Sequence, residues 1–255
     1  MSSVLITGAS KGIGRAIAVE LANRGHRVIA TARRPETLAD LPVDQRLRLD
    51  VTDQDSVDQA IVDAGEIDVL VSNAGATVRA PLESVPLAEV ERLYQLNTLG
   101  ALRVAQGVLP AMRERGSGRL LFVSSTQGRL VLPIIGPYGA SKWALEAIAE
   151  TLAIETRHFG IKVSIVQPGA VSTNGAEQAK VFFTEDDPYA PLYQQLRALR
   201  GEVITAEEVA AVVADTIEQP DPPLRVPAGA PAERALMARK EAPESEPFVL
   251  AELDW

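Results

Sequence analysis

A tyrosine and a lysine four residues apart, Tyr138 and Lys142, form the pair in this sequence best suited to proton transfer. On a helix, positions i and i+4 lie on one face, so the phenol and the ammonium can converge. A tyrosine ordinarily titrates near about pH 10, which is too high for acid–base catalysis at neutral pH. A neighbouring lysine favours the phenolate, so we expect Lys142 to lower the pKa of Tyr138 toward the working pH. The alternative is an exposed helical pair, which often arises by chance.

A glycine-rich turn occupies residues 7–14, with glycines at positions 8, 12 and 14. The turn follows the apolar run Val4–Thr7 and opens a segment of helical periodicity. Glycines at such positions allow a tight turn and a close approach of the backbone to a pyrophosphate, whose charge the helix N-terminus favours. A plain tight turn is the alternative, but the flanking strand and helix favour a dinucleotide-binding turn.

The elements that must position these groups alternate along most of the chain. Short apolar runs separated by helix-period segments indicate a parallel sheet that is covered on both faces. We predict one α/β domain over residues 1–255, a doubly wound parallel sheet with helices on both faces, which is a Rossmann fold. The predicted strands are Val4–Thr7, Val28–Ala32, Arg46–Leu49, Ile67–Ser72, Leu120–Ser124 and Ile161–Gln167, and the predicted helices are Ile13–Arg24, Asp53–Ala64, Leu87–Arg115, Tyr138–Phe159, Glu207–Glu218 and a short one around Glu233–Lys240.

The composition excludes several kinds of site. The sequence has no cysteine and only two histidines, so we expect no disulfide, no cysteine nucleophile and no metal site. A net charge of −9 argues against nucleic acid or an anionic membrane as a partner. No apolar run reaches the length of about 20 residues that a membrane helix needs, and no signal-peptide pattern opens the chain. We therefore expect a cytoplasmic protein.

The glycine turn reads TGxxxGIG and resembles the short-chain dehydrogenase/reductase family. That resemblance implies further cofactor-binding segments, and this sequence contains each of them in the family's order. Asp50 and Val51 match the position that contacts adenine, with a helix N-terminal acid as the alternative for Asp50. Residues 72–75 resemble the family's NNAG, where Asn73 ties neighbouring strands together, and residues 168–173 resemble its PGxVxT segment beside the nicotinamide. The implied cofactor-binding residues are Gly8, Ser10, Lys11, Gly12, Ile13, Gly14, Arg33, Arg34, Asp50, Val51, Asn73, Ala74, Gly75, Tyr138, Lys142, Pro168, Gly169, Val171 and Thr173.

The end of the second predicted strand indicates which dinucleotide binds. An acid there would bind the ribose of NAD, whereas arginine accommodates the 2′-phosphate of NADP. Ala32 stands where NAD-dependent members of the family place aspartate, and Arg33 and Arg34 follow it. Lys11 adds a cation, as in NADP-preferring members. We therefore predict NADP(H) as the cofactor, with a solvated strand end as the alternative for the two arginines.

The family resemblance also implies a catalytic set. Ser125 stands 13 residues before Tyr138, the family's spacing, and its hydroxyl would bond the substrate oxygen where negative charge develops. Ser124 is the rival serine. Asn97 matches the asparagine that kinks a helix and holds a water linked to the lysine, with a satisfied core amide as the alternative. The implied reaction is hydride transfer to or from a small-molecule carbonyl or alcohol.

The resemblance extends to the 17β-hydroxysteroid/retinol dehydrogenase-like branch, particularly over residues 136–150 and 224–229. It implies a hydrophobic ketone, aldehyde or secondary alcohol, selected by residues 127–137 and by a lid over about 173–200. Family members assemble as homodimers or homotetramers, here expected through the helices around 87–115 and 138–159. The end of the tail over about 244–255, from Phe248 to Trp255, either covers the site of a neighbouring subunit or is disordered.

Three other functions fit the same fold. A halohydrin dehalogenase lacks the dinucleotide turn and replaces the lysine, so Lys142 argues against it. An epimerase or dehydratase usually has a longer chain and a GxxGxxG turn. A non-catalytic NADP-sensing regulator remains open from the sequence, although the catalytic positions are all filled.

Overall fold

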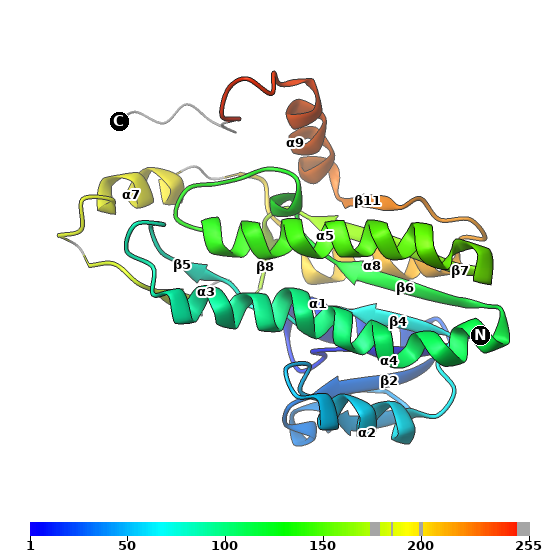
Figure 1. Cartoon of the computed structure of the whole chain (residues 1–255). Helices are drawn as coiled ribbons and strands as arrows, with labels where there is room; N and C mark the ends of the chain where they lie inside the picture. Colours follow the sequence, from blue (N-terminus) through cyan, green and yellow to red (C-terminus); the bar gives the residue numbers. More distant parts are fainter. Residues whose placement is uncertain (174–178, 185, 199–200, 249–255) are drawn as a thin grey trace.

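The central sheet of the protein is parallel throughout. The structure, a computed structural model, describes residues 1–173, 179–184, 186–198 and 201–248. Within them the sheet has seven strands in the order β11-β7-β6-β4-β1-β2-β3, and every pair is parallel (Figure 1). This confirms the predicted Rossmann fold. The strands are β1 (Ser3–Ile6), β2 (Arg27–Ala32), β3 (Gln45–Arg48), β4 (Val69–Ser72), β6 (Gly118–Val123), β7 (Ile161–Pro168) and β11 (Arg225–Ala228).

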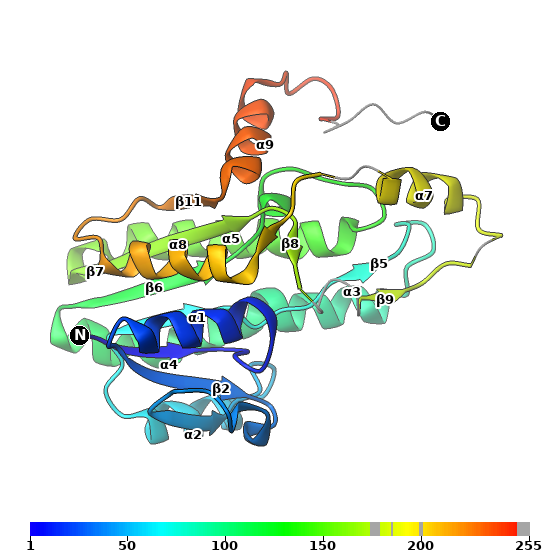
Figure 2. The same cartoon turned by 180° about the vertical axis from the view of Figure 1, so that it is seen from behind.

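Helices cover both faces of the sheet. One face carries α2 (Gln54–Ala64), α4 (Gly100–Arg115) and α5 (Gly136–Thr156), and α4 and α5 lie in front of the sheet in Figure 1. The other carries α1 (Gly12–Asn23) and α8 (Ala206–Glu218), which lie in front in Figure 2. Alternate residues of each strand supply the two cores, because successive strand side chains point to opposite faces.

Local signals in the sequence set the ends of several helices. Gly25 follows α1 with φ +79, the left-handed conformation that glycine adopts without strain. Asp53 caps α2 by accepting a bond from the Ser56 N–H. Thr205 and Glu208 form a capping box at the start of α8. These helices therefore begin and end within about two residues of the predicted bounds.

The long helix predicted over Leu87–Arg115 is interrupted. It consists of α3 (Leu87–Tyr94), a π-helical turn over Gln95–Leu99 and α4. Asn97, at the centre of that turn, is 1% exposed and bonds the main chain of Ala76. A kink at Asn97 is what the family resemblance implies, and π-helical turns often lie at functional sites.

Strand β11 was not predicted, because its sequence carries Pro227 and lacks an apolar run. It pairs with β7 at the edge of the sheet, where a proline costs little. Two small parallel pairs were also not predicted. They are β5 (Val78–Arg79) with β9 (Lys180–Val181) and β8 (Val171–Ser172) with β10 (Ile204–Thr205).

The remaining elements lie around the sheet. Helix α9 (Ala230–Glu241) stands beyond β11 and is longer than predicted, and α7 (Ala190–Ala198) lies in the expected lid segment (Figures 1 and 2). Short turns of 3-10 helix occupy Pro35–Leu38, Thr126–Gly128 and Arg157–Phe159. Among the described residues, no helix has the length and apolarity that crossing a membrane requires. Residues 174–178, 185 and 199–200 of the lid and 249–255 of the tail lie outside the described residues.

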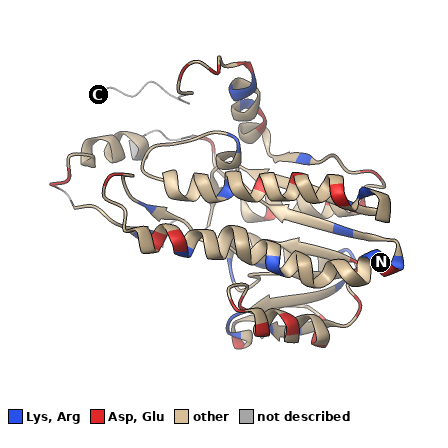
Figure 3. Ribbon diagram, in the orientation of Figure 1, with Lys and Arg blue, Asp and Glu red and all other residues tan. Residues whose placement is uncertain are grey.

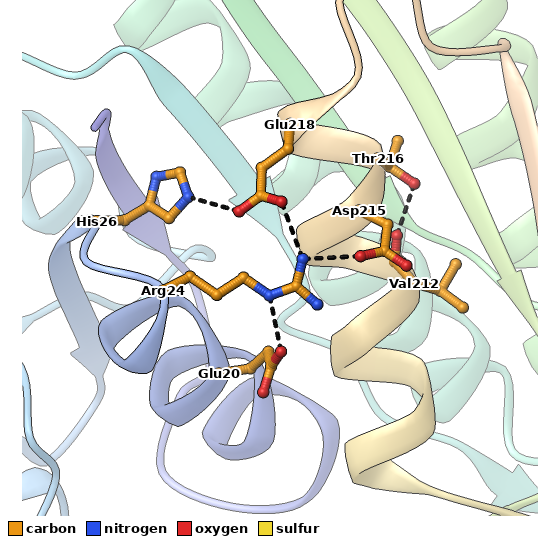
Figure 4. A network of polar contacts seen from close by, with 7 residues as sticks. All are labelled: Glu20, Arg24, His26, Val212, Asp215, Thr216 and Glu218. Atoms are coloured by element: carbon orange, nitrogen blue, oxygen red, sulfur yellow. Dashed lines mark hydrogen bonds and ion pairs between the residues drawn. The ribbon is translucent and has the colours of Figure 1, made fainter.

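An ion-pair cluster joins the ends of α1 and α8 (Figure 4). The Arg24 guanidinium bonds Glu20 at 2.8 Å, Asp215 at 2.7 Å and Glu218 at 3.0 Å. His26 Nε2 lies 3.4 Å from Glu218. The side chains of Asp215 and Glu218 are 61% and 45% exposed, so water screens these pairs. The apolar contacts beneath them, not the ions, hold the two helices together.

We expect the buried apolar contacts of α1 to contribute more to the stability of the protein than its ion pairs do. Ile17→Ala removes a fully buried side chain from the α1 face of the core and should lower the free energy of unfolding by about 2–5 kcal/mol. Arg24→Met keeps the apolar stem and should cost at most about 1 kcal/mol. Urea denaturation measures both. An Arg24→Met variant that lost as much stability as Ile17→Ala would contradict this assignment.

Candidate active site

The glycine turn packs directly against the segment that follows β4. Gly8 has φ +70, and a β-carbon there would lie 2.9 Å from the Ala74 Cα. A β-carbon on Gly14 would lie 2.4 Å from both Asn73 Nδ2 and the Gly8 carbonyl oxygen. Both positions therefore require glycine, and the turn presents main chain instead of side chains to the edge of the sheet.

Thr7 and Asn73 join the ends of β1 and β4. The Thr7 hydroxyl accepts bonds from the N–H groups of Asn73 at 2.9 Å and Ala74 at 3.0 Å. The Asn73 amide donates to the Thr7 carbonyl at 2.9 Å, as its expected strand-tying role requires. Thr7 is fully buried and was missing from the predicted set. Thr7 is the first residue of the TGxxxGIG motif, and that position could have identified it from the sequence.

The start of α1 lies beside the segment that follows β7. A β-carbon on Gly12, which has φ +55, would lie 3.5 Å from the Thr173 side chain. Lys11 is the exposed N-cap residue of α1 and makes no side-chain cap bond. Ile13 packs against the core, so only its main chain faces the turn. The N–H groups of this first turn are thus free of a side-chain cap from Lys11 and suit an anion.

The predicted adenine and ribose positions flank the ends of β2 and β3. Burial alone would raise the pKa of Asp50, but hydrogen bonds from Thr52 and the charges of Arg33 and Arg48 lower it below its usual value. Arg33 therefore lies within electrostatic reach of Asp50. Val51 is buried against Gly100, so its side chain belongs to the core. Arg34 is exposed, and its carbonyl oxygen accepts a bond from Thr37.

Ser125 and Tyr138 face each other at the carboxyl end of β6. The Ser125 hydroxyl interacts with the Tyr138 phenol, accepts the Gln127 N–H at 3.1 Å and lies 3.4 Å from the Pro168 carbonyl oxygen. Ser124, the rival serine, instead donates to a buried carboxylate, that of Glu146. The structure thus brings Ser125, and not Ser124, to the tyrosine.

Lys142 lies one helical turn after Tyr138 on α5. Its ammonium donates to the Val123 carbonyl at 2.8 Å and lies 5.8 Å from the centroid of the Tyr138 ring. Burial lowers the pKa of Lys142 to about 8, and the charge of Glu146 acts in the opposite direction. The lysine is therefore mostly charged at neutral pH but close to its titration point.

The expected lowering of the Tyr138 pKa is not found in this structure. Burial raises the pKa of Tyr138, and the bond with Ser125 offsets that rise only in part. The physical reason is that desolvation disfavours the phenolate, while the Lys142 ammonium is directed at the Val123 carbonyl. At neutral pH, Tyr138 is accordingly a protonated acid.

Asn97 lies close to Lys142, and its side-chain amide is hydrogen-bonded to other groups of the protein. Its Nδ2 donates to the Ala76 carbonyl and to the Ser141 hydroxyl, each at 2.9 Å, and its Oδ1 accepts the Ala76 N–H. A β-carbon on Gly75 would lie 3.2 Å from Asn97 Oδ1 and 3.8 Å from Lys142 Nζ. Ser141, which was not predicted, also donates to the Tyr138 carbonyl at 2.7 Å and so joins the helix break to α5.

The segment before Tyr138 contains a strained residue. Ile134 has φ +68, a conformation that is rare for a β-branched side chain. It is buried, and its carbonyl accepts the Ala80 N–H at 2.7 Å. Exposed apolar side chains surround this segment, at Leu82, Val131 and Trp143. Strain of this kind concentrates at ligand sites and loops that surrounding contacts hold in place.

The described part of the segment expected to form a lid is tied to the residues around β5 and α3. The Lys180 ammonium bonds Glu89 at 2.9 Å, and the Tyr189 hydroxyl bonds Glu83 at 2.5 Å. Within the lid, the rings of Phe183 and Tyr193 meet edge to face at 4.8 Å. Strands β5 and β9 add main-chain pairing between this segment and the residues that follow β4.

The comparisons with known proteins agree with this geometry. A family model described as short chain dehydrogenase matches residues 2–181. Retinol dehydrogenase 8 of Bos taurus is 36% identical over 251 residues, covering 88% of this chain and 80% of the relative. The human 17-beta-hydroxysteroid dehydrogenase type 1 is 36% identical over 248 residues, covering 87% and 76%.

A solved structure supports the same conclusion. The crystal structure of a short chain dehydrogenase from Burkholderia cenocepacia, determined in complex with NADP, superimposes with a TM-score of 0.80 at 25% identity. The match covers 94% of this chain and 93% of that one. The family resemblance expected from the sequence is therefore confirmed.

We expect Gly14→Ala to destabilise the protein although alanine favours a helix. The added β-carbon meets Asn73 Nδ2 and the Gly8 carbonyl at 2.4 Å, and such overpacking costs about 1–3 kcal/mol. Gly201→Ala is the matched control, because a β-carbon there has no atom within 4 Å among the described residues. Thermal unfolding compares the two. Equal midpoints would show that the turn tolerates a side chain.

Proposed function

Because the chain belongs to the short chain dehydrogenase family, we propose that it is an NADP(H)-dependent oxidoreductase acting on a hydrophobic carbonyl or alcohol. Membership of the family itself supports oxidoreduction at CH–OH or C=O groups. The observation that carries the proposal is the position of Ser125, Tyr138 and Lys142 together at one edge of the sheet, where the glycine turn also lies.

The residues at that edge fit a dinucleotide. Gly8 and Gly14 let the turn pack tightly against the segment after β4, and the start of α1 offers N–H groups to a pyrophosphate. We assign the 2′-phosphate to Arg33 and Lys11, with Arg34 beside them, and the nicotinamide end to residues 168–173. When bound, NADPH would supply the hydride.

The protein's own groups would handle the proton. In reduction, Ser125 and Tyr138 hold the substrate carbonyl oxygen, and Tyr138 gives up its phenol proton as that oxygen gains negative charge. The raised pKa of Tyr138 suits it as the acid. The Lys142 ammonium then stabilises the phenolate that is left.

Asn97 would support proton return by holding the segment beside Lys142. Both hydrogens of its amide are already donated within the protein, to Ala76 and Ser141. A water in the proposed relay therefore has to bond the second lone pair of Oδ1 or a main-chain carbonyl of the π-helical turn. In this assignment Asn97 acts chiefly through the helix break that it anchors.

A hydrophobic substrate accords with the surroundings of Tyr138. Leu82 and Val131 are 73% and 53% exposed, and Leu82 lies against Gly136, two residues before the tyrosine. The names of the two relatives point to a retinoid and a steroid as their substrates. We propose that this chain takes a ketone, aldehyde or secondary alcohol of comparable apolar character.

Self-association would use the outer faces of α4 and α5. The ribbon of both helices is mostly without charge in Figure 3. Trp143 and Ile154 of α5 are 40% and 74% exposed, which leaves apolar area for a second copy to cover. We propose a homodimer or homotetramer assembled through these helices.

We expect Arg33→Ala to weaken NADPH binding by about 10- to 150-fold, because one charge-assisted phosphate contact is lost. Binding of NADH should change little. Titration of the purified protein with each nucleotide, followed by nicotinamide fluorescence, measures both affinities. Arg113→Ala, which removes an exposed arginine from the last turn of α4, is the control. An Arg33→Ala variant with an unchanged NADPH/NADH ratio would count against the assignment.

We expect Tyr138→Phe to lower kcat by at least about 100-fold, because the proton donor is removed. NADPH affinity should stay near that of the wild type. The assay follows NADPH oxidation with 9,10-phenanthrenequinone and with a steroid 17-ketone. A variant that still turned over well would show that another group is the acid, whereas a wild type that bound NADPH but reduced neither ketone would favour the regulatory alternative.

A further inference from the structure

A carboxylate beneath the candidate active site, that of Glu146, takes no part in the chemistry described above. Glu146 is only 2% exposed. It lies on α5 four residues after Lys142 and eight after Tyr138, so the three side chains share one face of the helix. A buried carboxylate is costly unless donors satisfy it, so its retention at this place requires an explanation.

Three donors from three different strand segments converge on this carboxylate. Oε1 accepts from the Ser124 hydroxyl at 3.1 Å and from the Gln167 amide at 2.8 Å. Oε2 accepts from Arg225 Nε at 3.0 Å. Gly128 closes the remaining side, since a β-carbon there would lie 2.5 Å from Oε1. The residues that follow Ser124 and Gln167 are Ser125 and Pro168, both of the candidate site.

Arg225 bridges this buried carboxylate to an exposed one. Its Nη2 bonds Glu150 at 2.6 Å, one turn further along α5. The Glu150 side chain is 46% exposed, against 2% for Glu146. Two carboxylates of one helix therefore share one arginine of the edge strand β11, and only the inner one reaches the strands that carry the site.

The same carboxylate acts on Lys142. The lysine's ammonium is buried and bonds a neutral carbonyl, that of Val123, so it has no carboxylate hydrogen-bonded to it among the described residues. Burial lowers its pKa to about 8, and Glu146 is the charge that opposes the fall. The charged groups around Glu146 are Lys142 and Glu150 on α5 and Arg225 on β11, with Arg129 acting on Glu150.

We propose that Glu146 is a positioning residue of the reaction, which ties the strand ends beside Ser125 to helix α5 and holds a negative charge one helical turn from Lys142. The consequence for turnover rests on the proposed function, whereas the effect on Lys142 belongs to the folded protein alone. Removal of that charge should let Lys142 lose its proton at lower pH, because a nearby anion favours the charged lysine.

The direct test follows the titration of Lys142 by NMR. The chain has five lysines, so lysine labelled with carbon-13 gives few side-chain signals, and a Lys142→Arg spectrum assigns the one of interest. We expect a midpoint of about 8 in the wild type and one about a unit lower in Glu146→Gln. Glu146→Asp keeps the charge and should stay near the wild type.

Glu150→Gln is the matched control, since it removes a carboxylate that bonds the same arginine from the next turn of the same helix. Water screens Glu150, so the Lys142 midpoint should barely move. Arg225→Met provides a second test if Glu146→Gln fails to fold. This variant removes the cation that pairs with Glu146, so the Lys142 titration midpoint should rise. A Glu146→Gln midpoint equal to that of Glu150→Gln, or an Arg225→Met midpoint that does not rise, would overturn the proposal.

The role in the reaction is tested by the pH dependence of kcat, with NADPH and 9,10-phenanthrenequinone. The alkaline limb of the profile should move to lower pH in Glu146→Gln, in the same direction as the Lys142 midpoint, and return in Glu146→Asp. A limb that stayed in place while the midpoint moved would refute the positioning role. A wild-type protein that reduces no ketone would contradict the proposed function. The Lys142 titration midpoints measured by NMR would still decide whether Glu146 acts on Lys142.

Discussion

Every strand of the central sheet runs in the same direction, and the candidate site depends on that constraint. Parallel strands place all their carboxyl ends at one edge, so Thr7, Ser72, Val123 and Pro168 finish side by side although they are far apart in the sequence. The chain leaves each strand there through a turn, and the polar groups of those turns gather at the switch point of the sheet. The glycines at 8 and 14 then allow adjacent turns to touch.

Polar groups buried beneath that edge fix the positions of the side chains that the strand ends bring together. Asn97, Lys142 and Glu146 are each at most 4% exposed, and each is bonded to main chain or to another buried side chain. Such groups are costly when unpaired, so the native arrangement is the one that satisfies all of them together. The same burial sets the titration of the site, because it raises the pKa of Tyr138 and lowers that of Lys142.

Sequence patterns succeeded where a local signal decided the outcome. Apolar strands, the glycine turn and the helix caps depend on neighbours in the chain, so β1, α1 and α8 appear close to their predicted bounds. They failed where distant contacts decide. Strand β11 carries a proline and exists because β7 offers it a free edge. Helical periodicity also predicted one continuous helix over 87–115, and only the family resemblance implied the kink at Asn97, where Ala76 and Ser141 bind the side chain.

The sequence by itself determined the doubly wound sheet, the family to which the chain belongs and the residues that meet at the strand ends, because these follow from periodicity and from motifs read along the chain. The family's spacing had already pointed to Ser125. Only the tertiary structure decided that Ser124 bonds a buried carboxylate, where the Lys142 ammonium points and which carboxylate lies beneath it. Burial and hydrogen bonding between segments that are remote in sequence fix those three features, and they change the pKa of Tyr138 in the direction opposite to that expected from the Tyr–Lys spacing alone.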